Sequence, residues 1–131
     1  SGLSPHNQVT VSNLVDTLAH ISTMPDGDIL DALPVAGVSG TLRYRYGFNQ
    51  RPLKGNIRAK TGHLAGHYNL AGYLTDSQQQ TLSFSIFVSG YSLSAERDPE
   101  FAEPDRHVGY FFHSLFTDLH QHQHRIAAVT H

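Results

Sequence analysis

The stretch "NIRAKTGHLAGHYNLAGYLT", residues 56–75, contains two strand patterns separated by a short connection. Residues 56–61 place Asn56, Arg58 and Lys60 on one side and Ile57, Ala59 and Thr61 on the other. Residues 67–75 repeat the pattern, with one face formed by Tyr68, Leu70, Gly72 and Leu74. The connection between them, "GHLAG" at 62–66, is too short for a crossover, so the pattern predicts an antiparallel hairpin.

A third strand extends this hairpin into a sheet. Residues 81–89 place apolar side chains on one face and mostly serines on the other. The apolar face consists of Leu82, Phe84, Ile86 and Val88. Because only "DSQQQ" (76–80) separates this strand from the previous one, we expect an antiparallel meander of at least three strands.

Two helices are predicted beside the sheet. Residues 11–21 carry apolar side chains at helical spacing, with Thr10 or Ser12 as the N-cap and the breakers of residues 24–27 after the end. A second helix follows Pro104, with Asp105 as its cap, and should lie across the sheet. Its apolar stripe comprises Val108, Phe111, Phe112, Leu115, Phe116 and Leu119. The fold class is therefore α/β in the α+β sense: an antiparallel sheet packed by N- and C-terminal helices.

The remaining segments have little periodicity. Residues 29–55 are expected to form a long loop with a short helical turn near 41–46, and long loops in compact domains are usually functional. Residues 92–104 are predicted to be a polar loop. The tail from about 120 to 131 is expected to be frayed.

Composition excludes several kinds of protein. The chain has 131 residues, as expected for one domain, and a net charge of -2, so it has no electrostatic footprint for nucleic acid. It contains no cysteine and no apolar run of the roughly 20 residues that a membrane helix needs. It begins at Ser1 with neither a methionine nor a signal-peptide pattern, from which we expect a processed or excised piece.

The 10 histidines suggest a metal site, but their spacing argues against one. Three histidines, His120, His122 and His124, alternate with glutamines in the expected tail. Solvent-exposed side chains of a tail explain them more simply than a metal site does. His63 and His67 are four apart, yet the expected hairpin between them removes the shared helical face that such a motif uses. No metal and no cofactor are therefore predicted.

Lys60-Thr61-Gly62 is a more informative pattern. Taken alone, the triplet is common, and a surface lysine before a turn glycine would explain it. Its context is more specific, because the triplet closes a strand that is followed at once by a pairing strand. Penicillin-binding proteins and related β-lactamases place this triplet in such a setting.

Four blocks in order make the resemblance narrower. They are "SGLSPHN" (1–7), "LPVAGVSGTLRYR" (33–45), "AKTGHLAGHYNLAGYLT" (59–75) and "FVSGY" (87–91). Together they resemble the C-terminal part of class C low-molecular-mass penicillin-binding proteins, the penicillin-binding protein 4-type D-alanyl-D-alanine carboxypeptidases/endopeptidases. The resemblance implies a periplasmic or cell-envelope serine peptidase that acts on peptidoglycan stem peptides and reacts with β-lactams.

The chain departs from this family in two motifs. The family's nucleophilic serine and its base lysine lie in Ser-x-x-Lys, and a second motif is Ser-x-Asn. Neither occurs here, since the only lysines are Lys54 and Lys60 and the required serine positions hold Arg51 and Ile57. We therefore expect a C-terminal fragment that is inactive alone, with an incomplete sheet that pairs with itself or with the missing N-terminal half.

The resemblance also implies residue roles. Lys60 and Thr61 would bind the substrate's terminal carboxylate, Gly62 would leave room for it, and the backbone N–H of His63 would be one oxyanion donor. Many relatives carry serine or threonine where His63 stands. Other residues in the matched blocks are expected to shape the backbone or support the site: Asn7, Gly37, Gly40 and Asn69.

Some questions stay open at this stage. Arg43 and Arg45 are either peptidoglycan contacts or a solvated pair. A peptidoglycan- or β-lactam-binding module without a nucleophile is an alternative function, as is a metal-binding domain based on the histidine tail. The sequence does not separate carboxypeptidase from endopeptidase action, nor does it give the oligomeric state.

Overall fold

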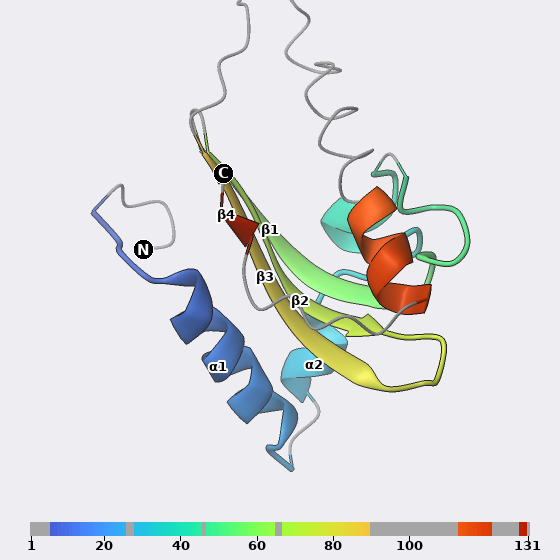
Figure 1. The fold of residues 1–131 in the computed structure, drawn as a ribbon, viewed down its shortest axis with the longest axis horizontal. Coiled ribbons are helices and arrows are strands. Elements are labelled where there is room, and N and C mark those ends of the chain that lie inside the picture. The colour runs from blue at the N-terminus through green and yellow to red at the C-terminus, as the bar shows by residue number, and fades with distance from the viewer. Residues whose placement is uncertain are drawn as a thin grey trace, which may run out of the picture.

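The computed structural model describes residues 6–25, 28–45, 47–64, 67–89, 113–121 and 129–130. Its centre is a sheet with strand order β1-β2-β3-β4 (Figure 1). The antiparallel meander is confirmed: β1 (Ile57–Leu64) pairs with β2 (His67–Thr75), and β2 pairs with β3 (Thr81–Ser89).

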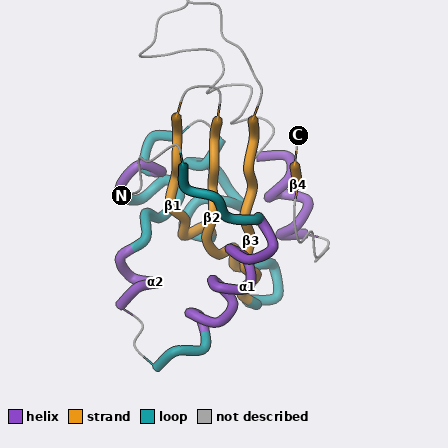
Figure 2. Tube along the Cα trace, turned by 90° about the vertical axis from the view of Figure 1, so that its left-hand side faces the viewer, coloured by secondary structure: helices purple, strands orange, loops and turns teal. Residues whose placement is uncertain are grey.

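The sheet is covered on both faces. Helix α1 (Val11–Ser22) lies on one face, as Figure 2 shows from that side, and the helical residues 113–121 lie on the other. The predicted apolar faces of the three strands point toward residues 113–121 and form the core with them. This core contains Leu42, Phe48, Leu53, Ile57, Ala59, Tyr68, Leu70, Leu74, Phe84, Ile86, Phe116 and Leu119.

Helix α1 has Thr10, one of the two predicted cap residues, as its N-cap. The hydroxyl of Thr10 accepts a hydrogen bond of 3.1 Å from the N–H of Asn13, whereas Ser12 lies inside the helix. The helix is attached to the sheet by the Tyr73 hydroxyl of β2, which donates to the carbonyl of Leu18 at 2.6 Å.

The segment before β1 is more structured than predicted. It contains the 3₁₀ helix η1 (Gly40–Leu42), which overlaps the short helical turn expected near 41–46 and begins one residue earlier. It also contains α2 (Asp28–Ala32), a helix that was not predicted. Val35 forms an isolated antiparallel bridge with Arg58. This segment is held in place by pairing with the edge of β1. Such long-range pairing produces no repeating pattern of apolar residues in the segment itself, so the sequence does not predict it.

The C-terminal helix packs as predicted in its described part. Phe116 is fully buried, and its ring meets Phe84 of β3 edge to face at 4.6 Å between centroids. The helix is attached to the β2–β3 turn, because the carbonyl of His120 accepts from the N–H of Ser77 at 3.0 Å. Residues 92–112, and with them the predicted polar loop, the Asp105 cap and the first half of the apolar stripe, lie outside the described residues.

The end of the chain differs from the expected frayed tail where it is described. His120 and Gln121 are helical, and β4 (Val129–Thr130) pairs in parallel with β3 at Ile86 and Phe87. The helix therefore runs past residue 119, and the sheet gains a short edge strand. Among the described residues, no helix has the length and apolar character that crossing a bilayer requires.

Candidate active site

The sequence pattern predicted that the triplet Lys60-Thr61-Gly62 closes a strand. The structure instead places it inside β1, which continues to Leu64. Strand pairing continues past it, with Gly62 opposite Asn69 and Leu64 opposite His67. The glycine does not stop the strand because an extended glycine still pairs through its backbone. The connection between β1 and β2 is correspondingly shorter than 62–66.

One edge of β1 faces away from β2 and is partly occupied by the segment before it. The N–H of Ala59 donates to the carbonyl of Pro34 at 3.0 Å, and the carbonyl of Ile57 accepts from the N–H of Ala36 at 2.9 Å. Both bonds lie on the outer edge. Successive residues of a strand direct their backbone groups to opposite edges, so every second residue of β1 faces outward.

This alternation gives the orientation of the backbone at the triplet. Counting from Ile57 and Ala59, the N–H and carbonyl groups of Thr61 and His63 face the outer edge. Lys60 and Gly62 instead direct theirs toward β2. The backbone N–H of His63 therefore points to the side where a molecule could approach β1 beyond residues 34–36.

The ammonium group of Lys60 lies at the same edge. Its side chain is exposed, and Nζ donates to the carbonyl of Thr61 at 2.6 Å. Because that carbonyl faces outward, the bond holds the positive charge beside the outer edge of β1. The positive charge held at the Thr61 carbonyl and the backbone N–H of His63, two residues further along this edge, together suit an anionic, carbonyl-containing ligand.

The hydroxyl of Thr61 is held by a residue of η1. Thr61 Oγ1 donates to Thr41 Oγ1 at 3.2 Å, and Thr61 is half-buried. The neighbouring Leu42 is fully buried, which anchors η1 against the core. Thr41 lies in a matched sequence block but was not among the predicted site residues, since no local pattern connects two threonines twenty residues apart.

The structure leaves enough space at Gly62 for a methyl side chain. A methyl group at this position would meet only Asn69, at 3.6 Å from its Cβ, which is an ordinary contact. Packing therefore does not require glycine here. The predicted role, leaving space for a ligand, remains a physical reason for a residue without a side chain.

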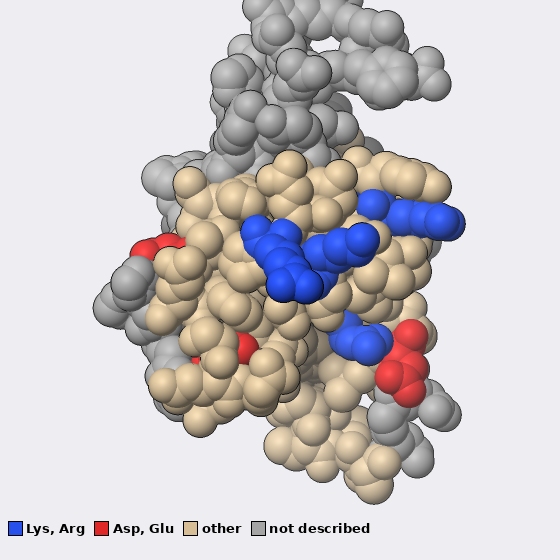
Figure 3. All heavy atoms as spheres, turned by 90° about the vertical axis from the view of Figure 1, so that its right-hand side faces the viewer, with Lys and Arg blue, Asp and Glu red and all other residues tan. Residues whose placement is uncertain are grey.

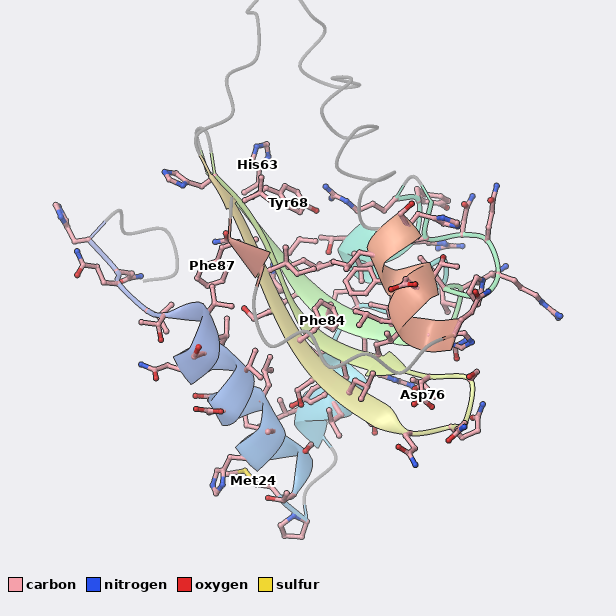
Figure 4. The ribbon with its side chains drawn as sticks, viewed as in Figure 1. Met24, His63, Tyr68, Asp76, Phe84 and Phe87 are labelled. Carbon is pink, nitrogen blue, oxygen red and sulfur yellow. The ribbon has the colours of Figure 1, made fainter. Side chains whose placement is uncertain are left out.

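On the core side of the sheet, the ring of Tyr68 contacts the side chains of both His63 and Arg45. The exposed ring of His63 lies 5.8 Å from that of Tyr68, the pair at the upper end of the sheet in Figure 4. The guanidinium of Arg45 lies 4.5 Å from the Tyr68 ring centroid. The guanidinium of Arg43 instead lies 5.2 Å from the ring centroid of the exposed Tyr44. The two arginines, which the sequence presents as a pair, therefore contact different aromatic rings.

Both glycines that were predicted to shape the backbone have the conformation that this role requires. Gly37 and Gly40 have φ values of +69° and +56°, in the left-handed region that side chains disfavour. Added methyl groups would also crowd Lys54 at 2.9 Å and Pro34 at 3.0 Å, respectively. Asn69 stands opposite Gly62, while Asn7 is exposed before α1.

The histidine pair of the hairpin does not converge. His63 shares a face with Thr61, whereas His67, paired with Leu64, belongs to the opposite face. No group of three or more metal-ligating side chains occurs among the described residues. His122 and His124 lie outside them.

The segment between α2 and β1 is positively charged. Residues 33–56 contain Arg43, Arg45, Arg51 and Lys54 and no acidic residue. Figure 3 shows Lys and Arg side chains gathered near the middle of the face on which this segment lies. The surroundings of the outer edge therefore favour anions.

Comparisons with known proteins connect this geometry to a family. Residues 1–104 match the family described as "D-Ala-D-Ala carboxypeptidase 3 (S13)". The chain is 41% identical over 93 residues to D-alanyl-D-alanine carboxypeptidase DacB of Haemophilus influenzae, covering 70% of the chain and 19% of that relative. It is 37% identical over 97 residues to penicillin-sensitive carboxypeptidase A of Dictyostelium discoideum, covering 68% of the chain and 18% of that relative.

Solved structures agree with this result. The crystal structure of penicillin-binding protein 4 from Haemophilus influenzae, complexed with a β-lactam, matches with a TM-score of 0.78 and 34% identity. That match covers 93% of this chain and 28% of the other. A second structure of the same protein gives a TM-score of 0.80 at 32% identity, with 93% and 26% covered. The chain thus spans about a fifth of the length of the curated relatives that it matches.

Proposed function

Because this chain belongs to the D-Ala-D-Ala carboxypeptidase 3 (S13) family, we propose that it is part of a serine-type D-alanyl-D-alanine carboxypeptidase/endopeptidase. The whole protein would cleave peptidoglycan stem peptides in the periplasm or cell envelope and would be acylated by β-lactams. The observation that carries the proposal is the arrangement of Lys60, Thr61 and the His63 N–H along the outer edge of β1.

The chain would supply the substrate-binding side of the reaction. Lys60 offers a positive charge to the terminal carboxylate of D-alanine, and the Thr61 hydroxyl donates a second bond to it. Gly62 leaves the approach clear. The N–H of His63 would stabilise the oxyanion that develops on the scissile carbonyl, and one such donor is typically worth about 10²–10³ in rate.

The nucleophile would come from another part of the protein. The chain contains neither Ser-x-x-Lys nor Ser-x-Asn, so we propose that residues 1–131 are inactive alone. A serine elsewhere would attack the carbonyl of the penultimate D-alanine, release the terminal one as an amine, and form an ester that water then hydrolyses. The second oxyanion donor would be the backbone N–H of that serine.

The cationic segment before β1 supports a role for the arginines. Arg45, which stacks on Tyr68 beside the ring of His63, and the exposed Arg43 are proposed to approach an anionic peptidoglycan strand. The alternative function is a peptidoglycan- or β-lactam-binding module that has no nucleophile. Such a module would use the same Lys60 and Thr61 contacts as the enzyme. Only a test for a covalent acyl-enzyme therefore distinguishes the two functions.

Intact mass spectrometry after incubation with benzylpenicillin tests the proposal. We expect one penicilloyl adduct on the full-length gene product that contains this chain and none on residues 1–131. An adduct on the 131-residue chain would mean that one of its own serines is activated. If neither protein is modified, the catalytic proposal is wrong and the binding module is favoured.

A further inference from the structure

We propose that Thr41 is a positioning residue for the hydroxyl of Thr61. The two oxygens are 3.2 Å apart, and this side-chain contact joins η1 to β1. The inference rests on the proposed function, because it concerns how Thr61 meets a carboxylate. It adds a residue to the site that lies outside the Lys60-Thr61-Gly62 triplet.

Thr41 is held firmly enough to orient another side chain. The next residue, Leu42, is fully buried, and its carbonyl accepts from the N–H of Gly37 at 3.0 Å. Gly40, just before it, has a positive φ, and a methyl group added there would crowd Pro34, whose carbonyl accepts from the N–H of Ala59 in β1. Backbone bonds and core packing therefore fix η1 relative to β1.

The contact can persist when a carboxylate binds. A hydroxyl has a single proton to donate and can also accept, so each of the two threonines is able to take either role. When Thr61 donates to a carboxylate, Thr41 can donate its own proton to the Thr61 oxygen. The contact is then kept, and the polarised Thr61 hydroxyl becomes a better donor. Serine at position 41 can supply this proton, whereas valine, of nearly the same shape, cannot.

Acylation kinetics in the full-length gene product test this role. We expect Thr41→Val to lower the second-order rate constant for benzylpenicillin about 3- to 10-fold, the range of one neutral hydrogen bond. Thr41→Ser should stay within about twofold of the wild type. Because Thr41 acts through Thr61, Thr41→Val combined with Thr61→Val should be no slower than Thr61→Val alone.

Other outcomes separate failure of the inference from failure of the proposed function. Wild-type rates in Thr41→Val, or losses that multiply in the double variant, overturn the positioning role while acylation stands. If the wild type is not acylated at all, the proposed function fails. The side-chain rotamer of Thr61, measured from three-bond couplings in the 131-residue chain, then decides the inference. It should be single in the wild type and in Thr41→Ser and averaged in Thr41→Val, and an unchanged rotamer in Thr41→Val would refute the inference.

Discussion

Phe116 of the C-terminal helix and Phe84 of β3 meet edge to face, with ring centroids 4.6 Å apart and planes inclined by 60°. Phe116 also approaches Phe48 at 6.0 Å, so one ring joins the helix, the sheet and the segment before β1. Aromatic pairs in this geometry stabilise beyond their buried area.

Truncating this ring should loosen all three elements. We expect Phe116→Ala to lower the free energy of unfolding of the chain by about 3–5 kcal/mol, measured by urea denaturation. The matched control is Ser114→Ala on the exposed side of the same helix, which should change it by less than about 0.5 kcal/mol. Equal effects of the two substitutions would show that the helix does not pack as described.

Two glycines on paired strands should respond differently to a methyl group. At Gly72 it would overlap the carbonyl oxygen of Arg58 and lie 2.6 Å from the Cα of Ala59, whereas at Gly62 it meets nothing closer than 3.6 Å. Gly72→Ala should therefore cost at least about 2 kcal/mol of folding stability, because backbone atoms must move.

Gly62→Ala should leave the melting temperature nearly unchanged and yet slow acylation of the full-length protein, because the methyl group narrows the approach to β1. A loss of stability in Gly62→Ala as large as in Gly72→Ala would remove the argument that Gly62 is there for a ligand.

The two lysines of the chain form a natural comparison. Lys60→Gln should slow acylation by benzylpenicillin about 10- to 100-fold, the range of one lost charge-assisted hydrogen bond. Lys54→Gln, which removes an equal charge from an exposed position in the segment before β1, should have a small effect that disappears at high salt. If the two variants behave alike, Lys60 acts only through the general field.

The backbone donor at residue 63 can be separated from its side chain. His63→Ala keeps the N–H and should change acylation by only a few-fold. His63→Pro removes it and should cost about 10²–10³ in rate. Since this N–H faces the outer edge and not β2, proline should not break the β1–β2 ladder, which circular dichroism can verify. Rapid acylation of the proline variant would contradict the proposed oxyanion donor.

Tyr73 predicts a dependence of stability on alkaline pH. Burial raises the pKa of its hydroxyl above the ordinary value of 10.0, and the neutral hydroxyl donates to Leu18. A raised pKa means that this contribution is complete below about pH 10 and is lost as the pH rises through the folded-state pKa.

Tyr73→Phe should therefore cost about 1 kcal/mol near neutral pH, and its deficit against the wild type should shrink above pH 10. Tyr44→Phe, at a residue that is 84% exposed, should show neither effect. A constant deficit of Tyr73→Phe from pH 7 to 11.5, measured by urea denaturation, would contradict the assigned burial effect.

Local patterns were sufficient for the elements that bury one face. The alternation in β2 and β3 predicted both strands and their core side, and the spacing in residues 11–21 predicted α1 with Thr10 among its caps. The same patterns missed α2, which at five residues is too short to show an amphipathic repeat. They also missed β4, whose two residues are defined only by pairing with β3.

The sequence by itself determined the hairpin, the chemical identity of Lys60, Thr61 and Gly62, and the resemblance to a family. Only the tertiary structure decided which backbone groups face outward, that Arg45 rather than Arg43 stacks on Tyr68, and that Thr41 meets Thr61. The physical reason is the pairing of residues 34–36 with the outer edge of β1. That contact joins segments more than twenty residues apart, and such pairing leaves no period in the sequence.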